Sequence, residues 1–121
     1  MSRLFKSFQW AMHGLKFCIT KEKNFQLHCA AAVIAMGLGF FLHLTSVEWM
    51  VVIICIALVL AFEMMNTAIE HVCNIIHPSI HPTVKIIKDV SAGAVFLIAI
   101  MAVVCGAIIF IPKMILYFNT I

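Results

Sequence analysis

Acidic residues are scarce in this sequence, and charged residues of either sign are few. Five positions are Asp or Glu, and charged residues make up 11% of the 121 residues, against 64% that are hydrophobic. Soluble domains carry about 25% charged residues, so a soluble fold of this composition would lack a polar coat. The length suits one domain. The composition therefore predicts a single membrane-embedded domain that covers 1–121.

Several sequence motifs are also missing, and each absence narrows the function. The chain has no P-loop, no G-x-G-x-x-G and no G-x-S-x-G, so any ATP site must use another scaffold. The net charge of +3 and the lack of basic residues interleaved with exposed aromatics give no support to nucleic-acid binding. Five cysteines without a C-x-x-C pair argue against a disulfide scaffold. No hydrophobic stretch precedes an A-x-A site, so we expect no cleaved signal peptide.

Three uncharged stretches are present, at 24–47, 49–62 and 90–112. A membrane span needs about 20 apolar residues, so the first and third stretches suffice. The second suffices only if it continues past Glu63, and a buried helix of a soluble protein is its alternative. Short loops and flanking spans favour the membrane. We expect helices at about 26–44, 47–76 and 86–118, with Pro78 and Pro82 in the loop that ends the second.

The segment before the first span has a different pattern. Hydrophobic residues recur there at three- and four-residue spacing, and basic residues lie mostly on other faces. This pattern is typical of an amphipathic helix at a membrane surface. We therefore expect an all-α membrane protein with a surface helix over 1–23 followed by three transmembrane helices.

Lysine and arginine are distributed unevenly between the loops. Five of them precede the first span and two precede the third, whereas the loop between the first two spans has none. Because basic residues stay on the cytosolic side, the sequence predicts a multi-pass protein with a cytosolic N-terminus. Glu48 then lies at the outer side, where we expect it to begin a helix and to play no catalytic role.

The remaining acidic residues point to a site. Glu63, Asn66 and Glu70 are three and four residues apart, so they share one face of a helix. Glu63 lies about 10 Å deeper in the membrane than Glu70, where a charge costs roughly 2.5–3.5 kcal/mol. It must face a protein interior, a metal ion or a water-filled cleft. Polar contacts that only hold helices together are the alternative, but two carboxylates and an amide on one face favour a function.

Two further polar groups lie at the same predicted edge. Lys88 and Asp89 open the third span, and Glu22 lies at the end of the surface helix. Taken alone, each is typical of an ordinary interfacial charge. Together, carboxylates from three segments can converge at the cytosolic edge, where magnesium prefers oxygen ligands and phosphate attracts lysine.

These polar groups also carry a family resemblance. The run Glu63-Met-Met-Asn66-Thr-Ala-Ile-Glu70 is followed eighteen residues later by Lys88-Asp89, and the upstream segment reads Thr-Lys-Glu22-Lys-Asn-Phe. This order resembles the bacterial integral-membrane diacylglycerol kinase and undecaprenol kinase family. The resemblance extends from about residue 3 to the third span.

The resemblance implies a homotrimer in the bacterial plasma (inner) membrane that transfers the γ-phosphate of ATP, with Mg²⁺, to a lipid hydroxyl at the cytosolic interface. It implies that Glu63 is the general base and that Glu22 and Glu70 hold magnesium. The residues that it implies for nucleotide binding are Lys88, Asp89, Glu22 and Glu70, and those for the lipid substrate are Arg3, Asn66 and Glu63.

The chain departs from that family's pattern at two positions. Asn74 stands where many members have Asp, so any role of that acid is lost or altered. His28 stands where the diacylglycerol kinases often have Glu, and the spelling Asn24-Phe25-x-x-His28 resembles the undecaprenol kinases more. The sequence does not decide between the two lipids. A non-enzymatic transport or assembly subunit is the alternative, but Lys88-Asp89 beside Glu22 at the cytosolic edge is not what an ion path requires.

Overall fold

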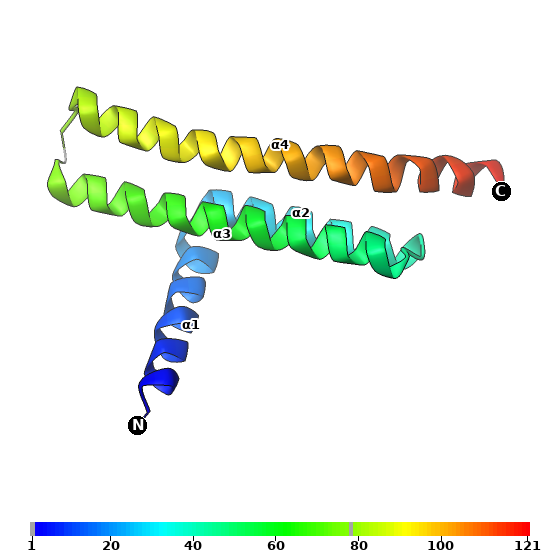
Figure 1. Cartoon of the computed structure of the whole chain (residues 1–121), viewed down its shortest axis with the longest axis horizontal. Coiled ribbons are helices and arrows are strands. Elements are labelled where there is room, and N and C mark those ends of the chain that lie inside the picture. Colours follow the sequence, from blue (N-terminus) through cyan, green and yellow to red (C-terminus); the bar gives the residue numbers. More distant parts are fainter. Residues whose placement is uncertain (1, 78) are drawn as a thin grey trace.

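The computed structural model describes residues 2–77 and 79–121, and these fold into helices alone. Figure 1 shows three long helices side by side and a shorter one that projects from them. The helices are α1 (Arg3–Lys21), α2 (Lys23–Phe41), α3 (Ser46–Ile76) and α4 (Pro82–Asn119). The predicted all-α fold, with an N-terminal helix before three spans, is confirmed.

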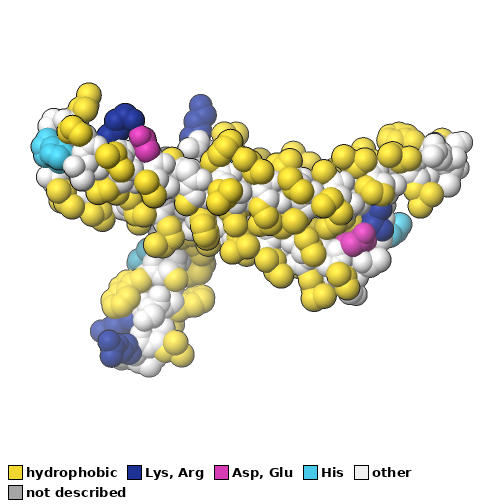
Figure 2. Space-filling view, turned by 45° about the horizontal axis from the view of Figure 1, so that its top comes forward, with side chains coloured by type: hydrophobic (Ala, Val, Ile, Leu, Met, Phe, Trp, Pro, Cys, Tyr) yellow, Lys and Arg dark blue, Asp and Glu magenta, His cyan; other side chains and the backbone are white. Residues whose placement is uncertain are grey.

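Helices α2, α3 and α4 are each long and apolar enough to cross a membrane. Their 19, 31 and 38 residues correspond to about 28, 46 and 57 Å, against roughly 30 Å of hydrocarbon. The middle of α3 and α4 has a continuous hydrophobic surface, and charged side chains lie towards its ends and on α1 (Figure 2). The chain is therefore a multi-pass membrane protein, and α3 and α4 extend beyond the hydrocarbon.

Helix α1 does not run along the spans but projects away from them at a steep angle (Figure 1). Large apolar side chains such as Phe8 and Trp10 are exposed on it, as expected for a helix that lies on a membrane surface. Its C-terminal half touches α3, where the Phe17 ring packs edge-on against His71 with centroids 5.5 Å apart. The surface helix is thus anchored to the second span.

A sharp corner separates α1 from α2, and Glu22 is the residue at that corner. Its backbone is extended (φ −103°, ψ 110°), so it ends one helix and precedes the next. The Gln26 side chain closes the corner by donating a hydrogen bond to the Ile19 carbonyl at 2.9 Å. The corner lies beside α3 and holds Glu22 half-buried.

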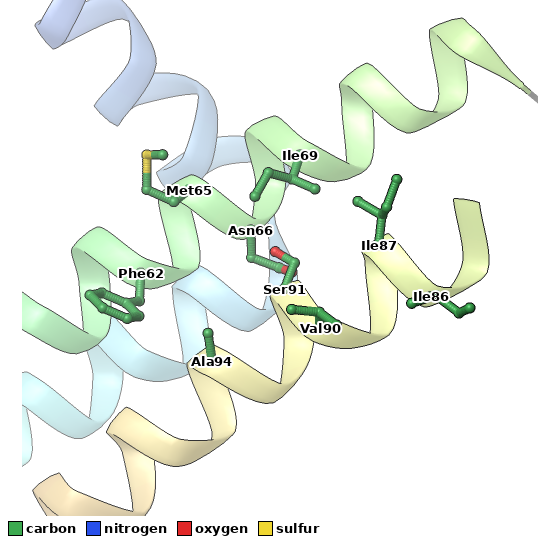
Figure 3. Close-up of a pocket in the computed structure, with 9 residues that line it drawn as sticks. All are labelled: Phe62, Met65, Asn66, Ile69, Ile86, Ile87, Val90, Ser91 and Ala94. Atoms are coloured by element: carbon green, nitrogen blue, oxygen red, sulfur yellow. The ribbon is translucent and has the colours of Figure 1, made fainter. Parts of the chain in front are cut away.

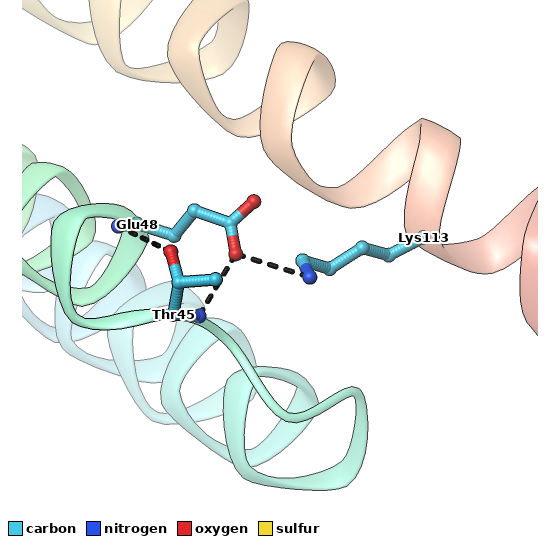
Figure 4. A network of polar contacts seen from close by, with 3 residues as sticks. All are labelled: Thr45, Glu48 and Lys113. Atoms are coloured by element: carbon cyan, nitrogen blue, oxygen red, sulfur yellow. Dashed lines mark hydrogen bonds and ion pairs between the residues drawn. The ribbon is translucent and has the colours of Figure 1, made fainter.

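The N-terminal end of α3 is fixed by a capping box. The Glu48 backbone N–H donates to the Thr45 hydroxyl, and the Thr45 backbone N–H donates to the Glu48 carboxylate at 2.9 Å. Lys113 of α4 reaches the same carboxylate at 3.1 Å (Figure 4). Glu48 is confirmed as a helix-start residue, and it also ties α3 to α4.

Replacement of Thr45 by alanine is expected to lower the free energy of unfolding by about 0.5–2 kcal/mol, because α3 loses its N-cap acceptor. Unfolding in mixed micelles with increasing denaturing detergent measures the change. Thr45→Ser, which keeps the hydroxyl, is the matched control and should match the wild type. Equal losses in both variants would show that the cap does not stabilise α3.

Helix α4 begins earlier than expected. It starts at Pro82 and not at about 86, and the His81 side chain accepts a hydrogen bond from the Thr83 backbone N–H. Proline suits the first position of a helix because its missing N–H would have no partner there. Pro82 therefore opens α4, and the loop after α3 is shorter than predicted. Pro78 lies outside the described residues.

The buried face of α3 changes character along its length. Towards its N-terminal end α3 presents Val52, Cys55 and Val59, and towards the α3–α4 loop it presents Glu63 and Asn66. These residues follow one another at spacings of three and four, so they form one stripe facing the other helices. The stripe is thus apolar in the N-terminal half of α3 and becomes polar in the half that contains the α1–α2 corner.

Candidate active site

The polar part of the α3 stripe is mostly inaccessible to solvent. Glu63 is 4% exposed and Asn66 is 6% exposed, while Glu70 is half-buried. The Asn66 amide donates to the Glu70 carboxylate at 3.2 Å. Asn74 lies one turn further towards the C-terminus, so polar side chains extend along α3 from its buried middle to its C-terminal end. We name Glu63, Asn66, Glu70 and Asn74 the polar ladder.

The α1–α2 corner brings further groups close to Glu63, at one end of this ladder. Burial raises the pKa of the Cys18 thiol, and the negative charges of Glu22 and Glu63 add to the effect. Both carboxylates therefore lie within electrostatic range of the end of α1. Glu22 and Glu70 are also within electrostatic range of Glu63. The structure thus gathers the three predicted carboxylates in one region.

Helix α2 contributes His28 to the same region. Its Nε2 atom lies 3.7 Å from Oε2 of Glu63, and the two side chains are 28% and 5% exposed. His28 also lies at one end of an apolar groove of about 640 Å³ between α2, α3 and α4, lined mainly by Ala, Val, Ile and Leu side chains. The groove extends from His28 towards Phe110, which packs near the N-terminal end of α3.

Within the polar ladder, Asn66 is the residue that faces α4. Its Oδ1 is buried and has no hydrogen-bond partner among the described residues. It lines a pocket of about 440 Å³ between α3 and α4, with the buried Ser91 of α4 nearby (Figure 3). A buried carbonyl oxygen without a donor is costly, so this atom is poised to accept a hydrogen bond from a bound molecule.

Two lysines at the start of α4 have different partners near Asn74, at the other end of the ladder. Lys88 donates to Oδ1 of Asn74 at 2.7 Å, which places its ammonium one turn from Glu70. Lys85 pairs with Asp89 at 2.6 Å, and both side chains are largely exposed. Lys88 therefore points at the ladder, and Asp89 faces outward with Lys85.

Arg3 is not brought to these groups. It is exposed in the first turn of α1, about 22 Å of helix from Cys18. No ion pair involves Arg3 within the described ranges 2–77 and 79–121. Any role of Arg3 in substrate binding must therefore use a lipid headgroup or another copy of the chain.

Metal-ligating side chains do not form a cage among the described residues. No group of three or more His, Cys, Asp or Glu side chains there is close enough to enclose an ion. Magnesium rarely needs such a cage, because one or two carboxylates with phosphate oxygens and water complete its shell. Glu22 and Glu70, both within electrostatic range of Glu63, are carboxylates of the kind that such a shell would use.

Two features were not predicted from the sequence. They are the approach of His28 to Glu63 and the bond from Lys88 to Asn74. Asn74 continues the three- and four-residue spacing of the ladder, and this spacing could have identified it. Nothing in the spacing of His28 relates that residue to α3.

Comparison with known proteins gives this geometry a family. Residues 9–110 match the family model of prokaryotic diacylglycerol kinase, which is most of the chain. The chain belongs to the prokaryotic diacylglycerol kinase family. The enzyme is therefore a lipid kinase, and the non-enzymatic alternative is set aside.

Individual relatives in this family act on different lipids. Undecaprenol kinase of Bacillus subtilis is 40% identical over 114 residues, covering 94% of this chain and 93% of that protein. Diacylglycerol kinase of Synechocystis is 34% identical over 112 residues, covering 92% of this chain and 64% of that protein. Diacylglycerol kinase of Haemophilus influenzae is 32% identical over 111 residues, covering 91% and 94%. The diacylglycerol kinase family thus contains similar proteins named for two acceptor lipids.

Proposed function

We propose that this lipid kinase transfers the γ-phosphate of ATP, with Mg²⁺, to the hydroxyl of a membrane lipid alcohol, and that Glu63 is the general base. The observation that carries the proposal is the burial of Glu63 within a membrane span, 4% exposed, beside acidic groups from two segments. A structural role does not require a carboxylate there, since an apolar residue would cost less.

The proposed nucleotide site extends along the polar ladder from the Asn74 end towards the α1–α2 corner. Lys88 supplies a positive charge for phosphate oxygens at the Asn74 end, and Glu70 on the ladder and Glu22 at the corner are the proposed magnesium ligands. Magnesium, when bound, neutralises charge on the phosphates. Asp89 faces outward, where it can contact the nucleotide beyond the phosphates. Phosphoryl transfer depends mainly on such positioning and electrostatics.

Replacement of Asn74 by alanine is expected to raise the KM for ATP several-fold. Lys88 would lose its 2.7 Å acceptor, and its ammonium would spread over several rotamers. Initial rates at saturating lipid and varied ATP measure the effect. Asn74→Asp keeps an acceptor and is the matched control. An unchanged KM in Asn74→Ala would show that the contact does not position Lys88 for phosphate.

The Glu63 end of the ladder is the proposed lipid site. The apolar groove that ends at His28 suits a hydrocarbon chain, and it would direct the hydroxyl of that chain towards Glu63. The unpartnered Oδ1 of Asn66 is the proposed acceptor for a donor on the substrate. Arg3 is proposed to contact an anionic headgroup at the surface.

Assembly and orientation complete the proposal. We propose a homotrimer, the assembly that the resemblance to this kinase family implies, in which neighbouring subunits would bring further basic groups such as Arg3. We propose that the N-terminus and the α3–α4 loop face the cytosol of a bacterium, across its plasma (inner) membrane. The clustering of Lys and Arg at those segments supports this orientation.

The acceptor is proposed to be undecaprenol or diacylglycerol, and the 40% identity to undecaprenol kinase favours the former. The test is phosphate transfer in mixed micelles with each lipid offered separately, with magnesium or with a chelator. Magnesium-dependent labelling of either lipid is expected, with undecaprenol the faster acceptor. Labelling that persists with the chelator would contradict the magnesium role, and labelling of neither lipid by folded protein would contradict the proposed acceptors.

A further inference from the structure

The surroundings of Glu63 contain one basic side chain. His28 of α2 lies 3.7 Å away, while the other ionisable groups in range are Glu22 at the corner and Glu70 on α3. The thiol of Cys18 on α1 is also in range. The described lysines at the start of α4 are engaged elsewhere, with Asp89 and Asn74. Among the described residues His28 is thus the group that can balance the carboxylate.

The exposure of the two side chains differs in a way that matters for proton transfer. The Glu63 side chain is 5% exposed, whereas that of His28 is 28% exposed. A base closed off from water must pass its proton to a neighbour before the next turnover. Imidazole can accept a proton on one nitrogen and release one from the other near neutral pH. His28 is therefore the more accessible of the two side chains, and it lies between the buried carboxylate and the surface of the chain.

The separation is compatible with such a role. A direct hydrogen bond requires about 2.6–3.2 Å, and catalytic contacts are often longer before substrate binds. At 3.7 Å, Nε2 of His28 and Oε2 of Glu63 are within ion-pair distance but are not hydrogen-bonded. His28 also ends the apolar groove, so a lipid hydroxyl that enters along the groove would arrive beside both groups.

We propose that His28 is the positioning residue for Glu63 and carries the hydroxyl proton from Glu63 to water. The proposal rests on the proposed function. The lipid oxygen would use a lone pair to bond to the γ-phosphorus, and the bond to the bridging oxygen would break, leaving its electron pair on ADP. The hydroxyl proton would pass to the Glu63 carboxylate, then to Nε2 of His28, and finally to water.

The test compares His28→Ala and His28→Gln with the wild type in the mixed-micelle assay. His28→Ala is expected to lower kcat by roughly 10²-fold with little change in the KM values for ATP and lipid. Added imidazole should restore part of the rate of His28→Ala, because it can enter the vacated space and accept the proton. His28→Gln keeps a hydrogen-bond donor but cannot carry a proton, so the kcat of this variant should also stay well below that of the wild type.

Each outcome bears on the proposal in a definite way. His13→Ala, on the exposed part of α1, is the matched control and should behave like the wild type. Full activity in His28→Gln would overturn the proton role, as would a loss in His28→Ala that imidazole does not reverse. A wild type without kinase activity would instead overturn the proposed function, and this proposal with it.

Discussion

Replacement of Glu63 by glutamine is expected to reduce phosphate transfer by roughly 10²- to 10⁴-fold, the usual range for loss of a general base. Glutamine has nearly the same shape but cannot accept the hydroxyl proton. Initial rates of lipid phosphorylation at saturating ATP measure the loss. The KM for ATP should change little, because Glu63 lies at the opposite end of the polar ladder from Lys88.

Stability separates this prediction from a purely structural role of Glu63. Removing a charge that is 4% exposed within a span should leave the folded state as stable or more stable. Glu48→Gln is the matched control, because glutamine also completes a capping box and Glu48 lies in the first turn of α3, away from the polar ladder. An active Glu63→Gln enzyme, or one that loses activity only by unfolding, would contradict the general-base role.

Replacement of Glu70 by glutamine is expected to lower kcat/KM for ATP by roughly 10²-fold, comparable to loss of one group that stabilises charge in the transition state. The neutral side chain would still accept the 3.2 Å hydrogen bond from Asn66. It would, however, be a weaker ligand for magnesium, which prefers charged oxygen. The ladder would thus keep its packing and lose its metal affinity.

A magnesium titration checks this second prediction. At fixed ATP, the Glu70→Gln variant should need a higher magnesium concentration for half-maximal rate than the wild type, and Glu48→Gln should not. A variant with reduced rate but an unchanged magnesium midpoint would show that Glu70 acts in some way other than metal binding. Circular dichroism in detergent confirms that both variants are helical.

The spans and the surface helix could be predicted because their signals are local. Long uncharged stretches reveal spans one at a time, and the spacing of residues such as Phe8 reveals a helix at the surface without reference to any partner. The start of α4 was misplaced because Pro82 was interpreted as ending a helix. Proline equally suits the first turn, and sequence spacing does not distinguish the two positions.

The candidate site could be predicted only where its members share one helix. Glu63, Asn66 and Glu70 occupy one face of α3 by their spacing alone. The contacts of His28 with Glu63 and of Lys88 with Asn74 depend on how far α2 and α4 slide along α3. That register is set by packing across the bundle, so no spacing within one segment reveals it.

The most direct measurement is transfer of label to lipid by the wild-type protein from ATP labelled in the γ-phosphate, compared with ATP labelled in the α-phosphate. Labelled lipid is expected only with the γ-label, with one ADP released for each lipid phosphorylated. ADP release with free phosphate and no labelled lipid, from folded protein supplied with magnesium and both candidate acceptors, would contradict this expectation.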